Sequence, residues 1–114
     1  MLRFRSLGSG SSGNATLVEG SDGLRITRLL VDCGFGLKQL DARLAMAGLD
    51  ADQIDAVFIT HEHGDHIGCA RQLALRNRKM VWMSPGTHAA LDAPDFQGLL
   101  QLAQDGTSID LGGI

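Results

Sequence analysis

Four side chains that can bind a metal ion lie within six residues near the middle of the chain: His61, His63, Asp65 and His66. Residues two apart at a strand end point the same way, so His61 and His63 can converge on one ion. Asp65 and His66 follow Gly64, which permits a sharp turn, and can hold a second ion close by. Four ligands on one corner do not easily close a tetrahedron around a single ion. This favours a paired, open site of the catalytic kind, and the donor set suits zinc, and also manganese or iron.

The same residues also have simpler interpretations. Asp65 can cap the N-terminus of the helix expected after it, and this role is compatible with metal binding. A lone histidine at a strand end is more often structural than a ligand, whereas three histidines and a carboxylate in six residues favour a metal site. His61-Glu62 begins the His-Glu-x-x-His zinc motif, but Asp65 stands where that motif needs its second histidine. The zincin interpretation therefore fails.

The motif lies where an expected strand meets an expected helix. Residues 56–60 are mostly β-branched, aromatic or small and apolar, which predicts a buried strand. Apolar residues at 67, 70, 73 and 74 recur at helical spacing and predict a helix that begins near His66. Such a strand-to-helix corner is where the sites of α/β proteins usually form.

The rest of the chain alternates between strand and helix patterns. Alternation or apolar runs predict strands over 2–7, 14–19, 24–31, 80–83 and 107–114. Helical spacing predicts helices over 37–47, 85–91 and 96–103, the last weakened by Gly98. Residues 50–53 are typical of a short turn. With no linker or repeat in 114 residues, we expect one small α/β domain.

Three stretches resemble the metallo-β-lactamase superfamily. His61-x-His63-x-Asp65-His66 after a hydrophobic strand is similar to the signature of that family. Residues 29–34, Leu-Leu-Val-Asp-Cys-Gly, resemble its earlier strand that ends in aspartate. Residues 7–14 resemble the opening loop of a cytoplasmic branch of phosphodiesterases and DNA exonucleases. The match runs from the start of the chain to about Gly86.

The resemblance implies a fold and a site. The family fold is a four-layer αββα sandwich of two β-sheets between helices, and residues 1–114 are expected to form only its first half, a single incomplete domain. Two divalent ions, zinc in the first instance, would be held by His61 and His63 and by Asp65 and His66. Asp65 would also orient the attacking hydroxide or take its proton. The remaining ligands, a histidine, a bridging aspartate and a last histidine, would come after residue 114.

Asp32 follows an expected buried strand, so its carboxylate needs a partner. The resemblance implies that Asp32 lies beside the metal site and orients a ligand without binding the metal itself. The alternative is an aspartate that caps a turn or helix.

The loop from Gly8 to Gly13 spells Gly-x-Gly-x-x-Gly, and Asp32 follows about 20 residues later, as in a dinucleotide-binding fold. That fingerprint must open a helix, whereas residues 14–19 predict a strand, so the dinucleotide interpretation fails. Free backbone N–H groups in such a turn can cradle an anionic group, which makes Ser11 and Asn14 candidate substrate contacts. A plain hairpin loop explains the same residues equally well.

Charge and cysteine content limit the possible partners. The formal net charge of −3 gives no global attraction to nucleic acid. Basic residues do cluster after the motif, either as a local nucleic-acid patch or as a solvated helix end: Arg71, Arg76, Arg78 and Lys79. Cys33 and Cys69 form no disulfide framework, so we expect two free thiols in a reducing compartment.

No apolar run reaches the length of a signal peptide or membrane span, so we expect a cytoplasmic protein without a membrane partner. His88 lies in an expected helix away from the motif and is expected at the surface.

The function that these observations predict is metal-dependent hydrolysis of phosphodiester bonds, in nucleic acid or a small phosphodiester. With two ligands for each ion, the 114-residue chain by itself is expected to bind zinc weakly and to be almost inactive. The alternative is a non-catalytic metal-binding or interaction module that pairs with a second chain, for example as a homodimer, through an open sheet edge.

Overall fold

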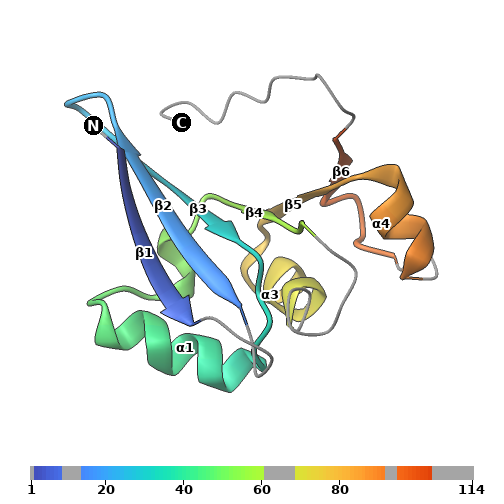
Figure 1. Cartoon of the computed structure of the whole chain (residues 1–114), viewed down its shortest axis with the longest axis horizontal. Helices are drawn as coiled ribbons and strands as arrows, with labels where there is room; N and C mark the ends of the chain where they lie inside the picture. The colour runs from blue at the N-terminus through green and yellow to red at the C-terminus, as the bar shows by residue number, and fades with distance from the viewer. Residues whose placement is uncertain (1, 9–13, 61–68, 92–94, 104–114) are drawn as a thin grey trace.

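The computed structural model of the chain describes residues 2–8, 14–60, 69–91 and 95–103. These residues form a mixed sheet whose strands follow one another in chain order from β1 to β6 (Figure 1). The strands are β1 (Leu2–Gly8), β2 (Ala15–Ser21), β3 (Ile26–Val31), β4 (Ala56–Phe58), β5 (Met80–Met83) and β6 (Leu100–Leu102). β1, β2 and β3 are antiparallel neighbours, whereas β4, β5 and β6 extend the sheet parallel to β3. The predicted α/β class is confirmed.

Two helices cover the same side of the sheet, α1 (Leu37–Met46) and α3 (Ala70–Asn77) (Figure 1). Leu44 of α1 and Leu73 of α3 are fully buried, and they share one hydrophobic core with Leu30, Val57 and Val81. The last three are register partners across β3, β4 and β5, so their side chains point to one face. The core therefore lies between the sheet and the two helices.

Local sequence signals explain where the helices begin and end. Gly48 has a φ of +76°, a left-handed conformation in which glycine carries no steric penalty, and it follows the end of α1. A 3-10 turn, η1 (Ala51–Gln53), occupies the predicted turn and begins with a capping box at Asp50. The short helix α4 (Pro85–Ala90) begins after Ser84, whose side chain accepts a hydrogen bond from the Thr87 N–H at 3.1 Å.

Two predicted elements differ from the structure. The helix expected over 96–103 is wrong: Gln97 and Gly98 have φ values of +53° and +85°, which no α-helix contains, and the next residues form β6. Leu100 pairs with Val81, because the buried β5 offers its backbone groups to a further parallel strand. The strand predicted over 24–31 begins at Ile26, after a turn. The strand predicted over 107–114 lies outside the described residues.

The core position of Leu30 gives a first prediction. Leu30 is fully buried in the centre of the sheet, so Leu30→Ala should lower the free energy of unfolding by about 2–5 kcal/mol through lost burial and an unfilled cavity. Leu24→Ala is the matched control, because Leu24 is 98% exposed and its truncation should change stability by less than about 0.5 kcal/mol. Urea denaturation of both variants measures the difference, and equal losses would contradict this placement of the core.

Candidate functional site

Asp32 lies directly after β3, at the edge where the parallel strands end. Its N–H donates to the Phe58 carbonyl of β4 at 2.7 Å, which prolongs the pairing of the two strands by one residue. Its φ is +63°, a left-handed conformation that aspartate tolerates better than most residues. The chain therefore turns at Asp32, and the residue is 7% exposed.

The Asp32 carboxylate holds the end of the segment that leads into the histidine motif. Its Oδ1 accepts hydrogen bonds from the Thr60 N–H at 2.8 Å and the Thr60 Oγ1 at 2.9 Å, and its Oδ2 lies 2.7 Å from the same hydroxyl. Thr60 immediately precedes His61 in the sequence. The carboxylate thus fixes both the backbone and the side chain of the residue from which the motif begins.

This arrangement refines the expectation for Asp32. The residue does not cap α1, whose N-cap is Gly36, and it makes well-formed hydrogen bonds rather than only shaping a turn. Sequence reasoning assigned no role to Thr60. The available signal was a hydroxyl residue at the end of one buried strand opposite an aspartate at the end of the neighbouring strand.

His61, His63, Asp65 and His66 lie outside the described residues, but the chain is described on both sides of them. On the upstream side Thr60 is bonded to Asp32. On the downstream side the Cys69 N–H donates to the Cys33 carbonyl at 3.2 Å. Both flanks of the motif are therefore attached to two consecutive residues, Asp32 and Cys33.

The glycine-serine loop begins at the end of β1 and returns to the same edge of the sheet. The Asn14 carbonyl accepts a hydrogen bond from the Gly34 N–H at 2.9 Å, two residues beyond Asp32. The loop joins two antiparallel strands, so the rejection of the dinucleotide fingerprint is confirmed. Ser11 lies outside the described residues, so of the two candidate loop contacts only Asn14 is placed, with its carbonyl bonded to Gly34.

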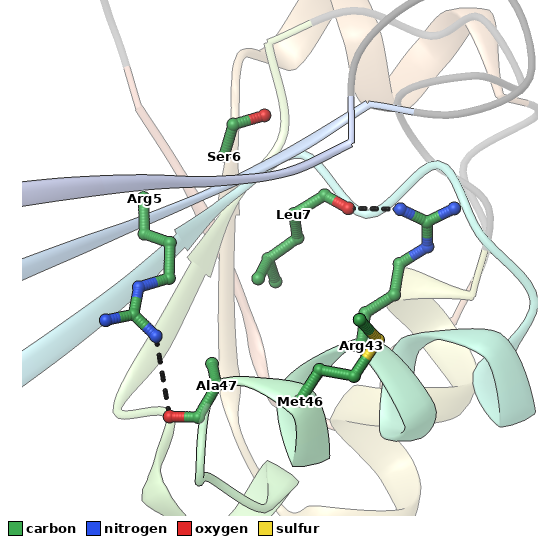
Figure 2. A pocket seen from close by; sticks show the side chains of 6 residues that line it. All are labelled: Arg5, Ser6, Leu7, Arg43, Met46 and Ala47. Carbon is green, nitrogen blue, oxygen red and sulfur yellow. Dashed lines mark hydrogen bonds between the residues drawn. The ribbon is translucent and has the colours of Figure 1, made fainter.

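An arginine on α1 fixes the strand end from which the loop departs. Figure 2 shows the Arg43 guanidinium donating to the carbonyl of Leu7, the residue before Gly8. The same guanidinium lies 4.3 Å from the centre of the Phe35 ring, a cation–π contact. Arg5 makes a longer hydrogen bond, 3.5 Å, to the carbonyl of Ala47. Between β1 and α1 these residues border a cavity of about 180 Å³, whose lining consists of Arg5, Ser6, Leu7, Arg43, Met46 and Ala47.

The close packing at Gly8 gives a second prediction. A Cβ at Gly8 would lie 2.4 Å from Cζ of Phe35 and 3.2 Å from Nη1 of Arg43. Phe35 is buried and cannot simply move away, so Gly8→Ala should destabilise the chain by about 1–3 kcal/mol. Adding Phe35→Leu should recover part of the loss, because a smaller side chain removes the clash. Thermal denaturation measures both, and a Gly8→Ala chain as stable as the parent would contradict the contact.

The basic residues after the motif are largely bonded to acceptors. Arg71 donates to the Asp95 carbonyl at 2.7 Å, and Lys79 donates to the Asp52 carbonyl at 2.7 Å. Arg76 makes two hydrogen bonds to the Asp41 carboxylate, at 2.8 and 2.9 Å, and these lower the pKa of Asp41. This pattern favours the solvated helix end over a nucleic-acid patch.

His88 differs in part from the surface position expected for it. The residue is half-buried on α4, and the centre of its ring lies 6.3 Å from that of Phe96.

Within the described ranges, helices remain too short and too polar to cross a bilayer.

Comparison with known proteins gives one family. The profile of the Metallo-beta-lactamase superfamily matches residues 8–113. The exodeoxyribonuclease WalJ of Streptococcus pneumoniae serotype 2 (strain D39 / NCTC 7466) is 32% identical over 90% of this chain and 37% of its own length. The anti-Pycsar protein Apyc1 of Paenibacillus sp. (strain J14) is 34% identical over 99% of this chain and 47% of its own length. The chain thus spans less than half the length of these relatives.

Solved structures share the fold at lower sequence identity. The Rm3 metallo-beta-lactamase superposes with a TM-score of 0.70 and 20% identity, over 96% of this chain and 45% of its own length. At that identity the likeness concerns the fold, and it agrees with the mixed sheet and the helices described above.

Proposed function

Because the chain belongs to the metallo-beta-lactamase superfamily, we propose that it supplies the metal-binding part of a hydrolase that cleaves phosphodiester bonds, with nucleic acid as the substrate class. The observation that carries the proposal is the bonding of Thr60 to Asp32, directly before the histidine motif. A buried carboxylate that fixes the residue before a ligand is the kind of support that metal sites need.

The donor chemistry of the motif fits divalent metal ions. His61 and His63 would hold one ion, and Asp65 and His66 the second. Imidazole and carboxylate suit zinc, with manganese or iron as alternatives that depend on geometry and availability. Ions bound there would lower the pKa of a water molecule and polarise the bond under attack.

The protein residues have separate tasks in this proposal. Asp65 would orient the attacking hydroxide or take its proton. Asp32 remains outside the metal coordination and keeps Thr60, and through it the start of the motif, in place. Its three short contacts to Thr60 are already formed in the chain described here, so this part of the site is preorganised.

The loop between β1 and β2 is the proposed substrate contact. Ser11 and the backbone N–H groups of the glycine-serine turn would receive a phosphate group. Asn14 and Leu7, at the two ends of the loop, are held by Gly34 and Arg43. Similarity to WalJ, an exodeoxyribonuclease, supports DNA over other phosphodiesters.

We further propose that these residues are one half of a four-layer sandwich. The sheet face opposite α1 and α3 has a continuous apolar row formed by register partners on neighbouring strands: Phe4, Val18, Leu29, Ala56 and Met80. Phe4 is 68% exposed in that row. A second β-sheet of the family fold would cover it, since sheets pack face to face through such apolar rows.

Turnover is the test of this proposal. Hydrolysis of linear double-stranded DNA and of a chromogenic phosphodiester should be measured with zinc or manganese, for the 114-residue chain and for a longer form that contains it. We expect the longer form to degrade DNA, and Asp65→Asn to abolish that activity. Turnover of the chromogenic compound without DNA degradation would replace nucleic acid by a small phosphodiester. Metal binding without turnover in either form would favour the non-catalytic module instead.

A further inference from the structure

The two cysteines meet between the residue that follows Asp32 and the residue that precedes α3. Cys33 and Cys69 are 0% and 1% exposed, and their Sγ atoms lie 2.9 Å apart as free thiols in hydrogen-bond contact. Their backbones are also joined, by the hydrogen bond from Cys69 N–H to the Cys33 carbonyl. We propose that Cys33 and Cys69 are a redox modification site that forms a reversible disulfide between the end of β3 and the downstream flank of the histidine motif.

The geometry needs little change to form this bond. A disulfide has an S–S distance of about 2.05 Å, so the two sulfur atoms must approach by only about 1 Å. The backbone hydrogen bond, 3.2 Å from the Cys69 nitrogen to the Cys33 oxygen, already holds the two residues side by side. Cys33 lies two residues after the end of β3, and Cys69 is the N-cap of α3, so the bond would join two rigid elements.

The two thiols are also chemically unequal. The hydrogen bond between the two sulfur atoms lowers the pKa of Cys69, while the same contact and burial raise the pKa of Cys33. In the proposed sequence Cys69 attacks first and Cys33 resolves the product.

Hydrogen peroxide serves as the oxidant in this proposal. The Cys69 thiolate attacks one peroxide oxygen, breaks the O–O bond and becomes a sulfenic acid, and the released hydroxide takes up a proton to give water. The Cys33 sulfur then attacks the sulfenic sulfur, loses its proton and expels a second water. Two thiols and one peroxide give one disulfide and two waters, with two electrons passing from the cysteines to the peroxide.

The bond would close a covalent loop that contains the whole motif. The two cysteines are 36 residues apart, and His61, His63, Asp65 and His66 all lie between them. Disulfides that close loops of this length reduce the entropy of the unfolded chain, so the oxidised form should resist unfolding better. Oxidation would also fix the distance between the end of β3, to which Thr60 is bonded through Asp32, and the start of α3, which follows the motif.

The test uses the 114-residue chain with a chelator present, so it does not depend on metal binding or on the proposed function. After peroxide treatment, intact mass should fall by about 2 Da, and both thiols should disappear from titration under denaturing conditions. Dithiothreitol should restore both. The oxidised chain should melt about 10 °C higher than the reduced chain. A gain of about 32 Da, which marks a sulfinic acid, or a lower melting temperature would overturn the proposal.

Two controls test whether the disulfide forms because the fold places the two thiols together, and not only because the chain contains two thiols. Cys33→Ser leaves Cys69 without a resolving thiol, so peroxide should neither close an intramolecular disulfide nor raise the melting temperature. The parent chain is also equilibrated in a glutathione redox buffer, once without urea, where it is folded, and once in about 6 M urea, where it is unfolded. The equilibrium constant for disulfide formation should be at least about tenfold larger for the folded chain. Equal constants in both conditions would show that the fold does not favour the bond.

Discussion

Replacing His61 or His63 with alanine is expected to weaken zinc binding by at least about 100-fold. We propose that these two side chains hold one ion, because residues two apart at a strand end point the same way. With so few ligands for each ion, the loss of one imidazole leaves little to retain the metal. The upstream anchor of the motif, Thr60 on Asp32, is untouched by either substitution.

Competition with a chelating dye measures this loss, and His88→Ala is the matched control. His88 lies on α4 with its ring against Phe96, so its removal should leave zinc affinity unchanged. Far-UV circular dichroism of each variant shows whether the fold is retained. Two outcomes would show that His61 and His63 are not metal ligands. One is a zinc affinity of all three alanine variants similar to that of the parent, and the other is an equal loss of affinity in all three.

The second large effect concerns Asp32. Asp32→Ala removes the acceptor of the Thr60 N–H and hydroxyl, and it puts alanine at a φ of +63°. Hydrogen bonds to a charged group contribute about 1.5–3 kcal/mol, and a left-handed conformation costs a non-glycine residue about 1–2 kcal/mol. We expect Asp32→Ala to lower the free energy of unfolding by about 3 kcal/mol and zinc affinity by about 10–100-fold.

Two further variants divide this effect into its causes. Asp32→Asn keeps a residue that tolerates the left-handed conformation and one oxygen acceptor, so it should lose about half as much stability. Thr60→Val removes only the hydroxyl and should cost about 1 kcal/mol. Urea denaturation gives the three values. A stability for Asp32→Ala within about 0.5 kcal/mol of the parent would show that the carboxylate does not hold this corner.

Local patterns predicted much of the fold. The alternation in 2–7 and 14–19 and the apolar runs at 56–60 and 80–83 each became a strand, since these patterns depend only on neighbouring residues. The same is true of the Ser84 cap. The motif was also visible, because its four candidate ligands are near neighbours in the chain.

What the sequence did not predict depends on partners far away in the chain. Thr60 bonds a carboxylate 28 residues earlier, and Cys69 contacts a thiol 36 residues earlier. Neither pairing leaves a periodic signal. Leu99 and Leu100 stand at helical spacing from Phe96, yet β6 forms because β5 is beside it. In that segment tertiary pairing outweighs local propensity.

The change from antiparallel to parallel pairing along the sheet also has a kinetic consequence. Leu17 meets Leu30 after a connection of roughly a dozen residues, whereas Leu30 meets Val57 only after about twice that. Each doubling of a connection adds about 0.6 kcal/mol of closure entropy, and hairpins form within microseconds. The three-stranded meander should thus assemble first, and β4 should dock later, in the higher-contact-order step. Asp32 and Thr60 face each other only across that late junction, so the corner that carries the motif is among the last parts of the chain to reach its native arrangement.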